Sequence, residues 1–155
     1  MNETMIQSLD SSSEVAELDQ LLWEILWKPL DLPRDIRDSF KLEGERLELG
    51  AKVGNLLVGG LVANWTSLTE VEIRHLAVRP DSHGRGIGSR LVAELLERVV
   101  EQGCTRVHTI ARNTSADFLR NLGFTTAPGE PPEHPLFKKH GITFELLQKD
   151  IEPSY

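Results

Sequence analysis

The chain has 155 residues, 39% of them hydrophobic and 26% charged, which is the size and composition of one compact domain with its own core. Its formal net charge of -7 disfavours non-specific binding to nucleic acid or anionic lipid. The longest apolar stretch, 56–63, falls far short of the roughly 20 residues that span a bilayer, and the single cysteine excludes an internal disulfide and a multi-thiolate zinc site.

The first residues predict neither secretion nor membrane insertion. Met1 to Thr4 lack the basic and apolar regions of a signal peptide, so we expect a cytoplasmic protein. One domain is expected over residues 1–155, without a metal site and without nucleic acid or a membrane as partner. A small molecule or a protein is the expected partner.

Two helices are predicted at the start of the chain. Ser11 and Glu14 have the spacing of a capping box, and the apolar residues that follow recur at helical spacing as far as Trp27. Pro29 ends this helix. Pro33 is suited to the first turn of a short second helix over residues 34–41.

Strands follow. Alternating residues predict strands 47–53 and 56–65, joined by the two-residue turn Gly54-Asn55. A third strand, 70–78, has apolar residues at both odd and even positions. This pattern is typical of a strand covered on both faces, so we expect it to be central in the sheet.

The second half of the chain alternates helices with strands. An apolar stripe predicts a long helix over 86–102, closed by Gly103. The further predictions are a strand at 106–111, a short helix at 115–122 and a last strand at 142–147. The proline-rich segment 127–141 is predicted to contain no regular element and to form a lid or a subunit contact.

A glycine-rich turn joins strand 70–78 to the long helix. Gly84, Gly86 and Gly88 let a ligand approach backbone N–H groups that no helical carbonyl accepts. These donors and the helix dipole favour a phosphate or pyrophosphate, although a helix entry that is merely glycine-rich is the alternative. Four arginines against one acid make the segment basic; they are Arg74, Arg79, Arg85 and Arg90, with Asp81.

Two common nucleotide motifs do not fit this turn. A P-loop requires Gly-Lys followed by Ser or Thr, whereas the chain has Gly88-Ser89-Arg90. A Rossmann fingerprint requires G-x-G-x-x-G after the first strand of a parallel unit, whereas here G-x-G-x-G follows an antiparallel meander.

The segment from Leu76 to Gly88 closely resembles the coenzyme A signature of the GNAT superfamily. Arg85, Gly86 and Gly88 fit the family pattern Q/R-x-x-G-x-G/A, whereas His83 stands where the pattern has Gln or Arg. The order of elements over residues 47–124 is also similar to this family, and so is the sequence that ends the short helix, residues 118–124. The resemblance implies an α/β (α+β) fold with a mixed, mainly antiparallel sheet flanked by helices.

The same resemblance implies acetyl-coenzyme A as co-substrate, bound in a cleft between splayed strands 70–78 and 106–112. Backbone groups of Leu76 and Val78 would pair with the pantetheine arm, amides from His83 to Ser89 would hold the pyrophosphate, and Asn113 is a further contact. The implied cofactor-binding residues are Leu76, Ala77, Val78, His83, Gly84, Arg85, Gly86, Ile87, Gly88, Ser89 and Asn113.

The implied reaction is direct transfer of an acetyl group to a primary amine of a small molecule or peptide. An amine with a pKa near 10.4 needs a base or a water relay, and Glu72 is the first candidate base. An ion pair between Glu72 and a neighbouring arginine is the alternative role. Glu70 and His75 are reserve candidates, although His75, like His108, also fits a structural histidine.

Two further residues bear on this chemistry. Many family members have a tyrosine acid where this chain has Leu119, and the only tyrosine is Tyr155. Water would then protonate the leaving thiolate, whose thiol pKa of about 8.5 makes it a tolerable leaving group. Cys104 follows a helix end and is expected to be structural.

The acceptor side of the implied site combines tryptophans with acids. Such a set would suit a cationic amine. Core or homodimer contacts for the tryptophans and a solvated face for the acids are the alternative. The residues are Trp23, Trp27, Asp31, Asp35, Asp38, Glu130, Glu133 and His134.

Two functions of other classes compete with the transferase. One is a coenzyme A-binding regulatory or interaction domain with little or no transfer, suggested by Leu119 and His83. The other is a nucleotide-binding module unrelated to coenzyme A, which would bind ATP or NAD better than acetyl-coenzyme A.

Overall fold

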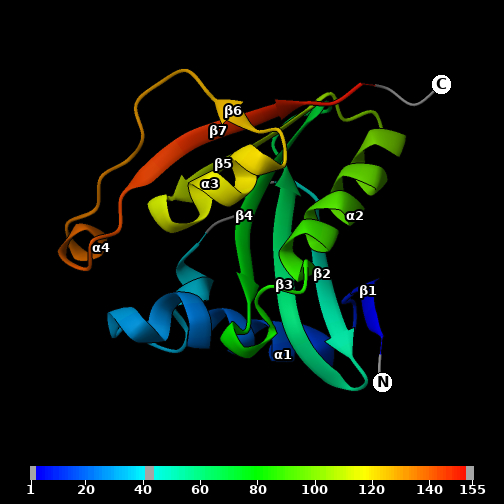
Figure 1. Ribbon diagram of the computed structural model, residues 1–155, viewed down its shortest axis with the longest axis vertical. Coiled ribbons are helices and arrows are strands. Elements are labelled where there is room, and N and C mark those ends of the chain that lie inside the picture. The colour runs from blue at the N-terminus through cyan, green and yellow to red at the C-terminus, as the bar shows by residue number, and fades with distance from the viewer. Residues whose placement is uncertain (1–2, 41–43, 153–155) are drawn as a thin grey trace.

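A seven-stranded sheet organises the protein in the computed structural model, which describes residues 3–40 and 44–152 (Figure 1). The strand order is β1-β2-β3-β4-β5-β7-β6, and β4 and β5 are the neighbours that run parallel. This confirms the mixed, mainly antiparallel sheet. The strands are β1 (Thr4–Ser8), β2 (Arg46–Val53), β3 (Leu56–Trp65), β4 (Glu70–Val78), β5 (Arg106–Arg112), β6 (Thr125–Thr126) and β7 (Phe144–Asp150).

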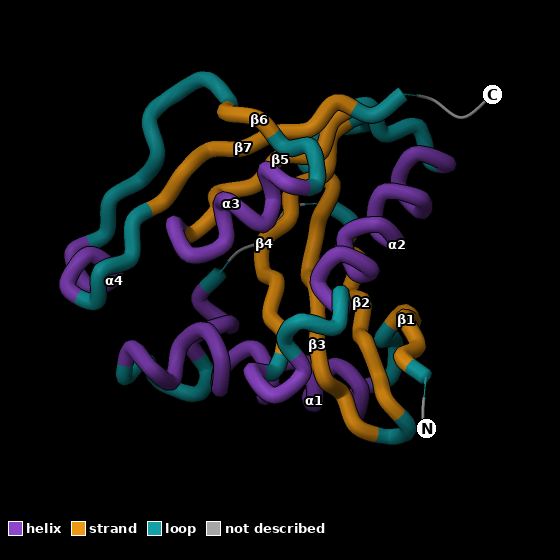
Figure 2. Tube along the Cα trace, in the orientation of Figure 1, coloured by secondary structure: helices purple, strands orange, loops and turns teal. Residues whose placement is uncertain are grey.

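Helices cover both faces of this sheet (Figure 2). On one face α2 packs on strands β1 to β4, and α3 packs on β5 and β7. On the other face α1 packs on β3 and β4 around buried leucines of its own. The helices and short helical turns are α1 (Ser12–Leu22), η1 (Trp23–Trp27), η2 (Lys28–Leu30), η3 (Ile36–Ser39), η4 (Pro80–Ser82), α2 (Ile87–Glu101), α3 (Asn113–Asn121) and α4 (Pro135–Lys139).

The predicted first helix is confirmed, with a wider final turn. Ser11 caps it: its hydroxyl accepts from the Glu14 N–H at 3.2 Å, and the Glu14 carboxylate accepts from the Ser11 N–H at 3.3 Å. After Leu22 the chain continues as the π-helical turn η1 as far as Trp27. Trp27 is buried and the Trp23 indole donates to the Leu32 carbonyl, so both tryptophans belong to the protein's own packing.

The predicted second helix over 34–41 is wrong, because the structure has only the 3₁₀ turn η3 there and Lys41 lies outside the described residues. The Ser39 hydroxyl donates to the Ile36 carbonyl at 2.6 Å, and the Phe40 N–H bonds the Arg37 carbonyl three residues back. These contacts take the carbonyls that a continuing α-helix would use.

The later predictions are largely confirmed, with shifted ends. The hairpin, the central strand and the long helix lie where predicted, whereas α3 begins two residues early and β7 begins two residues late. The prediction that 127–141 contains no regular element is wrong. Pro135 begins the short helix α4, and the His134 ring accepts from the Leu136 N–H at 3.2 Å. The short strands β1 and β6 had no predicted counterpart.

A β-bulge at Arg74 divides the central strand β4. Its register with β3 jumps from Ile73, opposite Ala63, to His75, opposite Val62. Before the bulge Ile73 packs in the core under α2, and after it Ala77 packs in the core under α1. Apolar residues therefore occur at both odd and even positions of β4. Helices cover both faces of the strand, and the bulge reverses which of these positions face α1 and which face α2.

Candidate active site

A cleft opens where β4 and β5 part. The two strands pair only from Glu70 and Arg106 to Ile73 and Thr109, and the Thr109 hydroxyl closes the last rung by donating to the Ile73 carbonyl at 2.9 Å. Beyond that rung lies a cavity of about 230 Å³. Its lining is Leu26, Trp27, Phe40, Glu72, Ile73, Arg74, His75, Leu76, Thr109, Ile110, Ala111, Arg112, Ser115, Leu119, Phe137 and Phe144.

Glu72 lines this cleft and is ion-paired there. Its side chain is 13% exposed, and its carboxylate lies 3.1 Å from the Arg74 guanidinium and 4.0 Å from Nδ1 of His108. The bulge at Arg74 brings Glu72 and His75 to the same face of the sheet, because their partners on β3 are Asn64 and Val62, two residues apart. Glu72 thus combines a place in the cleft with the ion pair that was the alternative role.

His75 is buried beside the cleft between two aromatic rings. Its ring centroid lies 5.0 Å from that of Trp27 and 5.3 Å from that of Phe40, and its Nε2 has no hydrogen-bond partner within the described residues. Burial first, and then nearby arginines, lower the pKa of His75 to about 3. Such a weak base is unsuited to accept a proton from an amine. The other reserve, Glu70, lies 3.9 Å from Arg106 and is not among the cleft residues.

Arg112 ends β5 inside the cleft and was not singled out from the sequence. Its Nη2 donates to the Leu26 carbonyl at 3.0 Å, and its guanidinium carbon lies 5.4 Å from the centre of the Phe137 ring. Burial lowers the pKa of this guanidinium. Because Leu26 and Phe137 are remote from β5 in sequence, only the tertiary structure reveals this environment.

The glycine-rich turn forms an open cradle of backbone donors before α2. Gly84 and Gly86 have φ of 80° and 72°, and a Cβ built on either would meet nothing within 4 Å. The first bond of the helix runs from the Arg90 N–H to the Gly86 carbonyl at 3.0 Å. The N–H groups of residues 87–89 therefore precede the helical ladder, and among the described residues no side chain caps them at Gly86.

The basic character of this turn comes from two of its four arginines. Arg74 is paired with Glu72, and Arg79 bonds Glu24 at 3.1 Å and the Leu57 carbonyl at 2.9 Å. Arg85 and Arg90 are exposed and have no ion-pair partner among the described residues. Their charge remains available to a ligand at the cradle.

The acetyltransferase (GNAT) family model matches residues 12–124, a span that includes the cleft strands and the glycine-rich turn. The chain belongs to the GNAT acetyltransferase family. An acetyltransferase of Pectobacterium atrosepticum is 30% identical over 94 residues, which are 56% of this chain and 65% of that protein, so the match spans less than two thirds of the relative's length.

Solved structures of low sequence identity share the fold. The PaiA N-acetyltransferase of Thermoplasma acidophilum, determined in complex with coenzyme A, has a TM-score of 0.73 at 14% identity and matches 96% of this chain and 99% of its own. ElaA of Escherichia coli has a TM-score of 0.76 at 19% identity, again over 96% of this chain and 99% of its own. The resemblance read from residues 76–88 is thus confirmed at the level of family and fold.

Two of the predicted cofactor-binding residues have partners of their own. Nε2 of His83 lies 2.9 Å from the Val78 carbonyl, a backbone group expected to face pantetheine. The Asn113 amide group donates to the Gly141 carbonyl at 3.2 Å, while its carbonyl accepts from the Thr143 N–H at 3.1 Å. Asn113 therefore ties the loop before β7 to the start of α3, and any contact with a cofactor stays a prediction.

Leu119, at the position where many GNAT enzymes carry a tyrosine, is buried in the cleft wall. The hydroxyls that line the cleft belong to Thr109, which is engaged with the Ile73 carbonyl, and to Ser115, one turn before Leu119. Tyr155 lies outside the described residues. The Cys104 thiol is buried, donates to the Arg106 carbonyl at 3.3 Å and has its pKa raised by burial, as a structural thiol would.

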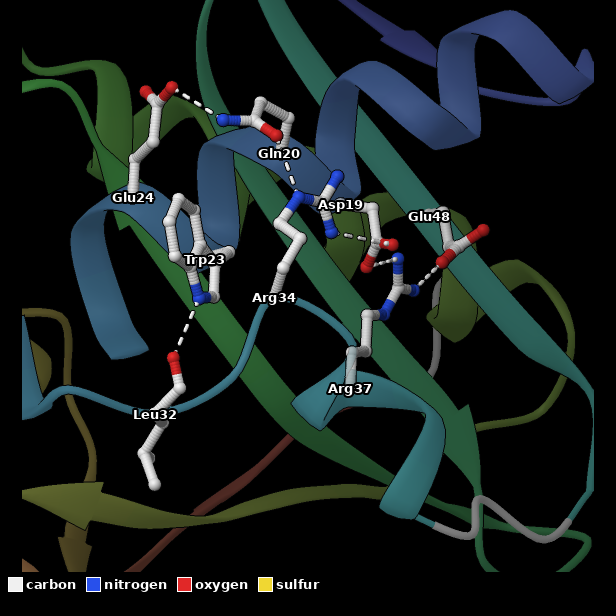
Figure 3. A network of polar contacts seen from close by, with 8 residues as sticks. All are labelled: Asp19, Gln20, Trp23, Glu24, Leu32, Arg34, Arg37 and Glu48. Atoms are coloured by element: carbon white, nitrogen blue, oxygen red, sulfur yellow. Dashed lines mark hydrogen bonds and ion pairs between the residues drawn. The ribbon is translucent and has the colours of Figure 1, made fainter. Parts of the chain in front are cut away.

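A polar network holds the segment that carries Phe40 against α1 and β2 (Figure 3). Arg37 pairs with Asp19 at 3.4 Å and also with Glu48, and Arg34 bonds Gln20 at 2.7 Å. The acids that the resemblance assigns to the acceptor side lie elsewhere. Asp31, Asp35, Asp38, Glu130 and Glu133 are exposed, and none is among the residues that line the cleft.

Proposed function

We propose that the protein is an N-acetyltransferase that moves the acetyl group of acetyl-coenzyme A to a primary amine of a small molecule or peptide, by direct transfer in a ternary complex. The observation that carries this proposal is the parting of β4 from β5 beyond Ile73 and Thr109. The same strand β4 lines the resulting cleft with Leu76 and then runs into the donor cradle around Gly86.

In this proposal the cradle binds the pyrophosphate. Amides of residues 83–89 would donate to it, and Arg85 and Arg90 would add charge at its rim. The backbone of Leu76 and Val78, which has no strand partner on the β5 side, would pair with the pantetheine arm. The thioester would then lie in the cleft beside Glu72.

Glu72 is the proposed base. The acceptor must lose a proton before its lone pair attacks the thioester carbonyl, and a carboxylate that is 13% exposed can take it directly or through one water. The tetrahedral intermediate then loses the second proton of its nitrogen to water and expels the coenzyme A thiolate, which takes up a proton from water. No tyrosine is needed for this step, because a thiol with a pKa of about 8.5 leaves readily.

The size of the cleft favours a small acceptor group. Its volume of about 230 Å³ is smaller than the roughly 300–1,000 Å³ of sites that enclose drug-sized ligands. Aromatic rings of Trp27, Phe40, Phe137 and Phe144 form much of its wall. We therefore expect a short amine, or only the end of a longer one, to reach the thioester.

Calorimetric titration with acetyl-coenzyme A, ATP and NAD tests the cofactor. We expect micromolar binding of acetyl-coenzyme A alone, abolished in Gly86→Glu because a side chain and a negative charge would enter the cradle. Gly103→Glu is the matched control, since Gly103 also has a positive φ and open space but lies at the other end of α2. Preference for ATP or NAD, or equal loss in both variants, would contradict the proposal.

Release of free coenzyme A with a panel of amines tests transfer and the base. We expect Glu72→Gln to lower kcat roughly 100- to 10,000-fold and to remove the acidic limb of the pH profile. Glu70→Gln, two residues earlier on the same strand and outside the cleft, should leave both unchanged. An unchanged kcat and pH profile in Glu72→Gln would show that Glu72 is not the base.

A second candidate function is a coenzyme A-binding regulatory domain with little or no transfer. Leu119 in the cleft wall favours it, because it stands where many family members carry the tyrosine acid. So does the ion pair that holds Glu72 to Arg74. Tight binding of acetyl-coenzyme A without coenzyme A release in the presence of any amine would support this alternative.

A further inference from the structure

The charges that line the cleft do not cancel. Glu72 is matched by Arg74 at 3.1 Å, which leaves Arg112 as the remaining charged side chain of the lining. Within residues 3–40 and 44–152 no carboxylate pairs with Arg112; its contacts there are the Leu26 carbonyl and the Phe137 ring. A protein with a net charge of -7 therefore keeps an uncompensated cation in its cleft.

An unpaired guanidinium in such a place is costly. Removing a charge from water is unfavourable unless a counter-charge and hydrogen bonds replace the solvent, and the neighbouring arginines Arg37 and Arg74 do have carboxylate partners. Arg112 has five N–H donors, of which Nη2 bonds the Leu26 carbonyl. The remaining donors form a planar fork suited to a carboxylate.

The position of Arg112 relates it to the proposed base. Glu72 lies opposite His108 on β5, and Arg112 follows His108 by four residues, so Arg112 projects from the same face of the sheet, farther along the cleft. An amine held at Glu72 and an anionic group held at Arg112 would occupy two ends of one cavity. The Phe137 ring, packed on the guanidinium, fixes the second end.

We propose that the acceptor is an amine that also carries a carboxylate, and that Arg112 is the specificity-determining residue that binds this carboxylate. The inference rests on the proposed acetyl transfer and adds the chemical class of its substrate. An acceptor with both an amine and a carboxylate replaces the purely cationic amine that the acceptor-side residues suggested. The acids that would bind such a cation lie outside the cleft lining. Amino acids and short peptides with a free carboxyl group belong to this class.

Matched pairs of acceptors test the inference on the unmodified protein. Glycine, β-alanine, 4-aminobutyrate and 6-aminohexanoate are each compared with the corresponding amide, which has nearly the same shape without the charge. We expect kcat/KM to be roughly 10- to 100-fold higher for the acid in at least one pair, as a charged hydrogen bond would give. Amides that react as well as their acids in every pair would overturn the inference and leave the transferase proposal standing.

Variants then assign the preference to one side chain. Arg112→Gln should raise KM for the acid until acid and amide are equal, with kcat and the Kd for acetyl-coenzyme A little changed. Arg112→Lys should keep part of the preference. Arg120→Gln is the matched control, because Arg120 lies on α3 outside the cleft lining, paired with Glu145 at 2.8 Å. An acid preference that survives in a folded Arg112→Gln protein would overturn the assignment.

A binding measurement separates failure of the inference from failure of transfer. The N-acetyl derivatives of the four acids, each beside its amide, are titrated into the protein saturated with coenzyme A, which requires no turnover. Binding of the acid alone in at least one pair, lost in Arg112→Gln, would support the carboxylate site even if no amine were acetylated. Equal binding of acid and amide, or binding of neither, in every pair would count against the site whatever the activity.

Discussion

At the scale of single residues, position in the sheet decides what a titratable group can do. Glu72 and His75 are both on β4 and both line the cleft, yet Glu72 has a cationic partner whereas His75 is enclosed by Trp27 and Phe40. The residue types were visible in the sequence. The difference between their surroundings was not visible there, because the bulge at Arg74 and the aromatic packing arise only when the chain folds.

His75 should make stability depend on pH. Its folded pKa of about 3 is below the unfolded value near 6.5, so under acid the unfolded chain binds the additional proton and stability falls as pH drops below about 6.5. Between pH 7 and pH 5 this contribution amounts to about 2 kcal/mol of the free energy of unfolding. Urea unfolding of the wild type should show this loss, and His75→Leu should lack it.

Exposed His140 provides the control for that measurement. His140→Gln should retain the full difference between pH 7 and pH 5, because the His140 side chain is exposed and takes no part in the aromatic packing around His75. Parallel pH dependence of the wild type and His75→Leu would show that His75 is not the group responsible.

At the scale of elements, local signals predicted those parts of the fold that need no distant partner. The apolar stripe of α2, the capping box of Ser11 and the Gly54-Asn55 turn specify their own structure, and all three were predicted correctly. The strand β1 exists only because β2 pairs with it. Phe40, at the extended end of η3, likewise packs against the rings of Trp27 and His75, which are distant in sequence.

The candidate site divides in the same way. The glycine-rich turn before α2 could be predicted, because glycines at alternate positions ahead of an amphipathic helix are typical of a tight turn with accessible backbone N–H groups. Its arginines could be counted, but not their partners: Glu24, which pairs with Arg79, is 55 residues away. The cleft itself depends on where β4 stops pairing with β5, and nothing in either strand marks that rung.

The network of Figure 3 should be essential for holding η3. Side chains of Arg37 and Glu48 are only 10% and 13% exposed, so Arg37→Met would leave the Glu48 carboxylate buried without its partner. We expect a loss of about 3 kcal/mol in the free energy of unfolding. The double variant Arg37→Met/Glu48→Met should recover much of it, because no charge then remains unpaired.

The comparison that isolates burial is Arg34→Met. Arg34 also pairs with Asp19, at 3.3 Å, but its side chain is 42% exposed. Its removal should cost at most about 1 kcal/mol by denaturant unfolding. Equal losses for Arg34→Met and Arg37→Met would mean that burial does not distinguish the two ion pairs.

At the scale of the whole molecule, the cleft lies between two parts of one sheet. Strands β1 to β4 with α1 and α2 form one part, and β5 to β7 with α3 form the other. Four paired positions on β4 and β5 join them, and one hydrophobic core runs through both, with Leu91 of α2 and Val107 of β5 in the same cluster. A ligand in the cleft would contact both parts at once.

Acetyl-coenzyme A should therefore raise the melting temperature and protect the edges of the cleft. At a concentration of 100 times Kd, binding adds about 2.7 kcal/mol to the free energy of unfolding, and a chain of this length should then melt roughly 5–10 °C higher. Amide hydrogen exchange should slow at residues 74–78 of β4, where pairing with β5 has ended, in addition to the general slowing that stabilisation brings. Gly86→Glu should show neither effect, while Gly103→Glu should show both. A rise in melting temperature without local protection of 74–78 would place the ligand outside the cleft, because a molecule bound only at the cradle leaves the unpaired edge of β4 open to solvent.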